Sequence, residues 1–150
     1  MARRVCVALA LMTLVLAPVL AASAQEMGMG PFSVTDHPTL GSILADLNGR
    51  TLYTWAGDST GTASACNEAC ATAWPPYLVD EGMAMTMMDP SMRAGTIQRN
   101  DGTYQAALDG WPLYYFSRDA ARGDANGEGS SGFGARWSVV KADDDMMMDM

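Results

Sequence analysis

Histidine is almost absent from this sequence, and basic residues are scarce. The 150 residues include a single histidine, His37, and only 9 lysines and arginines against 17 aspartates and glutamates. One histidine in an N-terminal segment cannot serve a buried nucleophile, so we expect no Ser–His–Asp triad. No glycine-rich phosphate-binding motif is present either. The net charge of −8 repels a phosphate backbone, so we expect no nucleic-acid partner.

Long apolar runs are missing after residue 20. Before that point, Arg3 and Arg4 precede an apolar stretch over residues 5–20, and small residues follow at 22–24. This layout is typical of a secretory signal peptide, and the stretch is shorter than the roughly 20 residues of a membrane-spanning helix. We predict cleavage near Ala24–Gln25, no membrane span in the mature chain, and a periplasmic or secreted location. An uncleaved N-terminal anchor is the alternative.

Cysteine is limited to three residues, of which Cys66 and Cys70 remain after the predicted cleavage. In an oxidising compartment we expect these two to form a structural disulfide. The alternatives are a redox-active pair and a pair of metal ligands. A redox pair usually needs a thiol of lowered pKa beside a cation or a helix N-terminus, whereas the neighbouring Glu68 is acidic.

The chain contains an internal repeat, in which residues 48–58 align with residues 109–119. Each copy begins with a dipeptide, Asn48-Gly49 or Asp109-Gly110, that favours a type I′ hairpin turn. Strand-like runs precede the turns at 42–46 and 103–108. Aromatic residues alternate after each turn, which places each pair on one face of a strand. These pairs are Tyr53 with Trp55, and Tyr114 with Phe116.

Each copy then passes through a polar loop and ends on a tryptophan, Trp74 or Trp137, followed by a short strand-like run. A single hairpin is marginal in water, so the copies must share a core. We predict a mainly β fold with two hairpin–loop–strand repeats and a short helical insert around Cys66–Cys70. The predicted core is Leu52, Trp55, Trp74, Leu78, Leu113, Phe116, Trp137 and Val139. The predicted segments are a signal peptide (1–24), a flexible lead-in (25–37), a repeat domain (38–142, copies about 40–79 and 95–141) and an acidic, Met-rich tail (143–150).

The motif of both copies resembles that of a known family. Residues 53–58 (YTWAGD) and 114–119 (YYFSRD) fit Tyr-x-(Phe/Trp/Tyr)-x-x-Asp, the motif of a bacterial secreted-repeat family described as predicted lipoproteins. Cys66-x-x-x-Cys70-Ala71 with Trp74-Pro75-Pro76, and Gly110-x-Pro112-Leu113-Tyr114, also match, over roughly residues 40–141. The resemblance implies a two-copy fold and no assigned function. Many relatives carry a lipid-acceptor cysteine where this chain has Gln25, so we expect no lipid anchor.

Two groups of acidic residues are candidate sites. Asp58 and Asp119 end the two motif copies, and they either accept backbone N–H groups at the turns or form an acid/base pair or cation site. Asp124, Asn126 and Glu128 resemble the start of a calcium loop, but its closing glutamate is missing.

Methionine is the most unusual feature of the composition, with 13 residues. Thioethers are soft ligands that select Cu(I), whereas methionine also fills irregular cores. We predict weak Cu(I) binding, with copper as the candidate cofactor. The candidate ligands are Met83, Met85, Met87, Met88, Met92, Met146, Met147, Met148 and Met150.

These patterns together favour an exported, non-enzymatic binding or envelope-associated module, with an envelope protein as the candidate partner. One alternative is a redox protein or other enzyme that uses Cys66 and Cys70. Another is a purely structural or protein-interaction domain. An aromatic platform for a sugar or an aromatic ligand is a further alternative. Its candidate residues are Tyr53, Trp55, Trp111, Tyr114, Tyr115 and Trp137.

Overall fold

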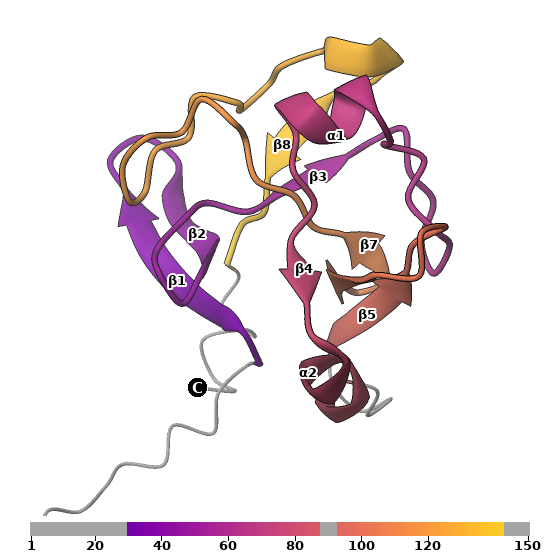
Figure 1. Ribbon diagram of the computed structural model, residues 1–150. Helices are drawn as coiled ribbons and strands as arrows, with labels where there is room; N and C mark the ends of the chain where they lie inside the picture. Colours follow the sequence, from indigo (N-terminus) through magenta and orange to yellow (C-terminus); the bar gives the residue numbers. More distant parts are fainter. Residues whose placement is uncertain (1–29, 88–92, 143–150) are drawn as a thin grey trace, which may run out of the picture.

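The computed structural model describes residues 30–87 and 93–142 (Figure 1). The predicted signal peptide, the acidic tail and six of the candidate copper ligands lie outside these residues. Those ligands are Met88, Met92, Met146, Met147, Met148 and Met150. No helix within the two described ranges is long and apolar enough to cross a membrane.

The fold is mainly β, as predicted, and each copy of the repeat contributes three strands in series. The first copy consists of β1 (Phe32–His37), β2 (Gly41–Asp46) and β3 (Tyr53–Trp55). The second consists of β5 (Ala94–Gln98), β6 (Tyr104–Leu108) and β7 (Trp111–Pro112). The pairs β1–β2, β5–β6 and β6–β7 are all antiparallel. Figure 1 shows β1–β2 and β5–β7 on opposite sides of the molecule, with β3 and β8 between them.

The prediction of a flexible lead-in over 25–37 is wrong for residues 32–37, which form β1. Phe32–His37 pairs along its whole length with β2, from Phe32 opposite Asp46 to His37 opposite Gly41. The reason is burial on one face: Phe32 lies in the core, and Val34 packs against it. These alternating apolar residues stabilise a strand despite the Gly- and Met-rich segment that precedes them.

The strand that follows each closing tryptophan joins the other copy. β4 (Leu78–Val79) pairs with β6 of the second copy, and the neighbouring Pro76 forms a bridge with Tyr114. β8 (Trp137–Val139) pairs with β3 of the first copy, where Val139 lies opposite Tyr53. This exchange of strands means that neither copy can complete its sheet alone.

Equivalent residues of the two copies meet at the centre of the molecule. The backbone N–H groups of Tyr53 and Tyr114 each donate to the other's carbonyl oxygen, at 2.9 and 3.0 Å. The rings of Trp74 and Trp137 are stacked in parallel, with centroids 3.9 Å apart. The two copies are therefore related by an approximate two-fold axis through these pairs.

The two turns differ from each other. Asp109 and Gly110 both have positive φ angles, 50° and 79°, as the predicted type I′ turn requires. In the first copy only Gly49 has a positive φ, so the type I′ prediction was wrong there. That turn is wider because Asp46 Oδ1 accepts hydrogen bonds from the backbone N–H groups of Asn48 and Arg50, both at 2.9 Å.

Two clusters of buried residues form the core, and most predicted core residues lie in them. Phe116 is only partly buried and packs against the second cluster. Leu78 was wrongly assigned to the core and is 47% exposed. Its neighbours Tyr77 and Val79 pack against the first cluster, so the alternation of β4 directs Leu78 outwards.

Short helices occupy the loop before Trp74 and the connector between the two copies. α1 (Ala69–Ala73) lies at the predicted insert beside the disulfide. α2 (Glu81–Thr86) lies in the connector, for which no element was predicted, and its N-terminus is capped by Asp80, which accepts a hydrogen bond from Met83 N at 2.7 Å. A short 3₁₀ turn, η1 (Gly132–Gly134), precedes β8.

Candidate functional site

The family motif forms two crossed links between the copies. Tyr53 of the first copy donates to Asp119 Oδ2 of the second at 2.6 Å, and Tyr114 of the second donates to Asp58 Oδ2 of the first at 2.5 Å. The other carboxylate oxygens bind equivalent loop positions. Asp58 Oδ1 accepts from Ala65 N at 2.8 Å, and Asp119 Oδ1 from Asn126 N at 3.0 Å. Each aspartate therefore acts as a loop anchor, and each binds a different tyrosine.

The two links differ in burial. Asp58 is 7% exposed, and the Tyr114 hydroxyl that it binds also contacts the buried Ser64 hydroxyl. Asp119 is only partly buried, and the hydroxyl of its partner Tyr53 accepts a hydrogen bond from Gly127 N at 3.3 Å. Burial, followed by the hydrogen bond to the carboxylate, raises the pKa of both tyrosines far above the ordinary value.

Cys66 and Cys70 form a disulfide, with Cα atoms 5.2 Å apart. A buried arginine from the second copy holds this loop. Arg99 donates to the Cys66 carbonyl oxygen at 2.9 Å, and to Gln105 Oε1 on β6 at 2.6 Å. The sequence around Cys66 and Cys70 contains no basic residue. Arg99, which directly follows β5, thus brings a positive charge to the disulfide loop. No local pattern marks Arg99 as buried, so sequence reasoning missed it.

The three described candidate methionines differ in burial. Met87 is buried, and Met83 packs against the first core cluster. Met85 is 69% exposed. Met85 therefore differs in burial from the other two, and copper binding by these three residues also stays a prediction. For the candidates outside the described ranges, copper binding stays a prediction.

The residues of the suggested calcium loop bind other partners. Asp124 Oδ2 accepts from Ala120 N and Ala121 N, at 2.9 and 2.8 Å. Glu128 accepts from Val139 N at 2.6 Å and forms an ion pair with Arg136. Within the described residues, no group of three or more His, Cys, Asp or Glu side chains could hold a metal ion.

The predicted aromatic platform is largely core. Tyr53, Tyr114 and Trp137 are fully buried, and Trp55 is 8% exposed. Trp111 is only partly buried. The platform interpretation is therefore wrong for most of its residues, and only the neighbourhood of Trp111 remains.

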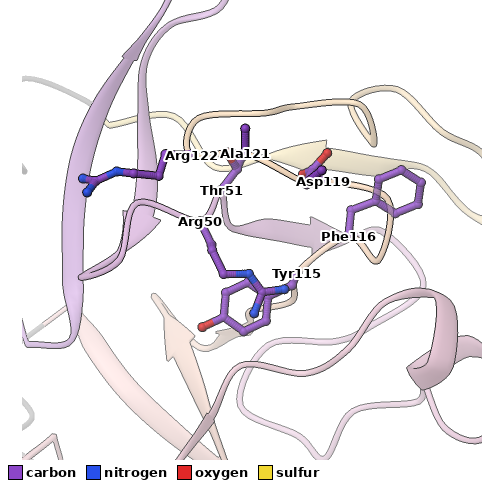
Figure 2. Close-up of a pocket in the computed structure, with 8 residues that line it drawn as sticks. Arg50, Thr51, Tyr115, Phe116, Asp119, Ala121 and Arg122 are labelled. Carbon is purple, nitrogen blue, oxygen red and sulfur yellow. The ribbon is translucent and has the colours of Figure 1, made fainter.

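One pocket, which we call the Arg50 pocket, lies where the first turn meets the second motif copy (Figure 2). Its volume is about 140 Å³. The Arg50 guanidinium lies 3.8 Å from the centroid of the Tyr115 ring, and Tyr115 donates to Asp46 Oδ2 at 3.0 Å. The lining residues are Arg50, Thr51, Tyr115, Phe116, Asp119, Ala120, Ala121 and Arg122.

Thr51 is the unusual residue in this pocket. It is 2% exposed, and its Oγ1 has no hydrogen-bond partner among the residues that the structure describes. A buried hydroxyl without a partner costs about 1–3 kcal/mol. Figure 2 shows Arg50 reaching across Tyr115, while Arg122 extends away from it.

A second pocket, which we call the Trp111 pocket, lies at the equivalent place of the other copy. Its volume is about 210 Å³, and it is lined by Thr54, Trp55, Ala56, Trp111, Arg136 and Ser138. In the repeat alignment Trp111 replaces Arg50, Thr54 replaces Tyr115, and Trp55 replaces Phe116. Trp55 Nε1 is buried and, like Thr51 Oγ1, has no partner within the described residues.

The comparison with known proteins agrees with the two-copy architecture. A family model described as a secreted repeat of unknown function matches residues 34–77 and 95–141, one match for each copy. No curated protein and no solved structure matches the chain. The two matches cover more than half of the sequence and confirm the resemblance drawn from the motif. The chain belongs to the family of secreted repeats of unknown function.

Proposed function

We propose that the protein is an exported, non-enzymatic binding module that holds a small oxyanion, such as a phosphate or carboxylate group, in the Arg50 pocket. The observation that carries this proposal is the pairing of an arginine held over an aromatic ring with a buried hydroxyl that lacks a partner. Arg50 and Thr51 both line one small cavity.

Arg50 is held in place before any ligand arrives. Stacking on Tyr115 is worth about 0.5–1 kcal/mol at an exposed site, and the Tyr115 hydroxyl is fixed by Asp46. A guanidinium group has five N–H donors, and those at its edge stay available when its face covers a ring. An oxyanion can therefore accept hydrogen bonds from Arg50 with little loss of side-chain entropy.

Thr51 and Arg122 add to this preference. An oxyanion could accept the hydrogen bond that the Thr51 hydroxyl lacks, which would offset the cost of burying that hydroxyl. Arg122 lines the same pocket, and Gly49 leaves it room, because a Cβ there would lie 2.6 Å from Arg122 Nε. Since its side chain extends away from Tyr115 in Figure 2, Arg122 contributes positive potential rather than a direct contact.

A binding role fits the way in which the reactive residues are used. The motif tyrosines and aspartates bind each other across the copies, and the cysteines are joined in a disulfide. Export is supported by the signal-like N-terminus, by the family's description as secreted, and by the disulfide. We place the cleavage after Ala24.

The test is a titration of the ¹⁵N-labelled mature protein with inorganic phosphate and with acetate, followed by NMR. We expect amide shifts around residues 50–51 and 119–122, with a Kd on the order of 1–10 mM. Arg50→Gln should weaken binding about tenfold, which corresponds to about 1.4 kcal/mol. Arg118→Gln removes the same charge from an exposed residue outside the pocket, and it should leave the Kd almost unchanged.

Thr51→Val makes the test sharper because its two effects have opposite signs. Removal of the unpartnered hydroxyl should stabilise the fold slightly, whereas it should weaken phosphate binding severalfold. Equal weakening by Arg50→Gln and Arg118→Gln would indicate a general charge effect and would refute the site. Shifts confined to other parts of the molecule would refute it as well.

A further inference from the structure

We infer that the Trp111 pocket is a binding site for a single sugar ring. This site is separate from the Arg50 pocket and does not depend on the proposal made for it. The inference rests on two indoles, two hydroxyl-bearing residues and one guanidinium that line the same cavity.

The indoles provide rigid apolar surface. Trp55 is fixed by stacking on Trp137, with centroids 5.5 Å apart and an interplanar angle of 14°. The backbone of Gly57 closes over its benzo ring, since a Cβ at Gly57 would lie 2.4 Å from Trp55 Cζ2. Trp111 is partly buried on β7 and follows a turn whose Gly110 carbonyl accepts from Gly61 N at 2.9 Å. Because Trp55 is only 8% exposed, it forms a rigid wall, and Trp111 is the indole that can pack against the C–H face of a sugar.

The polar groups favour a sugar over a purely aromatic ligand. Thr54 and Ser138 bring hydroxyl groups to the lining. A sugar carries hydroxyl groups around its rim that can pair with these donors and acceptors. A flat aromatic ring would leave them unpaired in a desolvated site, which is unfavourable.

Arg136 lies at the same pocket with a fixed orientation. Its Nη2 pairs with Glu128 Oε1 at 3.2 Å, and its Nε donates to Ser138 Oγ at 3.4 Å. These contacts use two of the five donors of a guanidinium, and the side chain is 64% exposed. Because Glu128 already balances its charge, Arg136 suits hydroxyl acceptors on a neutral ring better than a second anion.

The size of the cavity limits the ligand. Its volume of about 210 Å³ is below the roughly 300–1,000 Å³ typical of pockets for drug-sized ligands. One ring fits this space, and further units of a longer saccharide would extend into solvent.

The test is an NMR titration of the ¹⁵N-labelled mature protein with glucose, galactose and N-acetylglucosamine, and with phenol as the aromatic comparison. We expect shifts of the indole N–H signals of Trp55 and Trp111 with at least one sugar, at a Kd on the order of 1–10 mM. Trp111→Ala should weaken binding about tenfold or more. Phe133→Ala removes an exposed aromatic residue outside the pocket and should leave the Kd unchanged.

A second variant covers the case in which Trp111→Ala fails to fold. Arg136→Gln changes a mostly exposed side chain, and it should weaken sugar binding severalfold while the far-UV circular dichroism stays the same. Arg50→Gln should leave sugar binding unaffected, which keeps this test separate from that of the oxyanion site. The inference is overturned if none of the three sugars shifts either indole signal, or if phenol binds more tightly than every sugar.

Discussion

The two copies of the repeat use their matching and their differing residues for different purposes. Where the copies match, as in the motif tyrosines and aspartates, the side chains bind each other across the two-fold axis. Where they differ, as at Arg50 and Trp111, the side chains line pockets at equivalent places. Residues shared by both copies therefore hold the fold together, and residues found in one copy are free to determine a ligand.

The matching and the differing residues also contribute differently to stability. Because β4 and β8 are exchanged, each copy depends on the other for a strand and for a partner of its aspartate. A substitution of the tyrosine or of the aspartate in a crossed link therefore also removes a contact of the opposite copy. The pocket residues have no such constraint, since Arg50 and Trp111 lie at the surface ends of their turns. This difference leads to three predictions beyond the two binding tests.

The largest expected effect is loss of stability at high pH, through tyrosines of both copies. Burial raises the pKa of Tyr77 to about 12, and it raises the pKa values of Tyr53, Tyr114 and Tyr115 further above the ordinary value of 10.0. A raised folded pKa means that the stabilisation is fully present below pH 10 and is lost as the pH rises towards the folded pKa. Each tyrosine then contributes a loss of about 1.4 kcal/mol per pH unit.

The measurement is urea unfolding at a series of pH values, combined with tyrosinate absorbance. We expect the free energy of unfolding to fall steeply above pH 10, and most tyrosinate absorbance to develop together with the loss of circular dichroism. If these tyrosines ionised reversibly near pH 10 in the folded protein, the prediction would be wrong. The crossed links would then not be buried as described.

The second prediction compares how much each of the two crossed links contributes to the free energy of unfolding. Tyr114→Phe leaves Oδ2 of the buried Asp58 without its partner and removes one of the partners of the Ser64 hydroxyl, so we expect it to cost about 3 kcal/mol. Tyr53→Phe leaves Asp119 partly exposed and still bound to Asn126, so we expect a cost of about 1 kcal/mol. Urea unfolding near pH 7 provides the comparison.

Tyr104→Phe is the matched control, because no hydrogen bond of its hydroxyl contributes to either link, and we expect a change below about 0.5 kcal/mol. Equal costs for Tyr53→Phe and Tyr114→Phe would mean that the difference in burial between Asp58 and Asp119 has no energetic consequence. A larger cost for Tyr53→Phe would contradict the comparison directly.

Local sequence patterns predicted the parts of the fold that depend on neighbouring residues. The alternation of Tyr53 with Trp55 placed them on one face of a strand, and the structure buries that face, while Asp109-Gly110 predicted the correct turn. The first turn was assigned wrongly because Asp46, a residue outside the repeated dipeptide, binds its backbone. The alternation of Phe32 and Val34 was a usable signal for β1, but the Gly- and Met-rich residues before it suggested flexibility.

The candidate sites were harder to predict because they depend on contacts between distant segments. The exchange of β4 and β8 brings Arg136 and Ser138 to Trp111, and no local period records that exchange. Arg99 reaches the disulfide loop for the same reason. One signal was available in the sequence: the alignment of the copies pairs Arg50 with Trp111 and Tyr115 with Thr54, and these mismatches mark both pockets.

The smallest expected effect comes from making one pocket resemble the other. Trp111→Arg should abolish sugar binding, but it should create little affinity for phosphate, because Thr54 cannot hold a guanidinium as Tyr115 holds Arg50. Adding Thr54→Tyr should restore an Arg–Tyr pair, and we expect phosphate binding at the second pocket to improve two- to fivefold over Trp111→Arg, which is about 0.4–1 kcal/mol. The same NMR titration gives both affinities.

If Trp111→Arg alone bound phosphate as tightly as the Arg50 pocket does, the aromatic support of the arginine would be unimportant. Charge alone would then decide the ligand, and the difference between Tyr115 and Thr54 would carry no function.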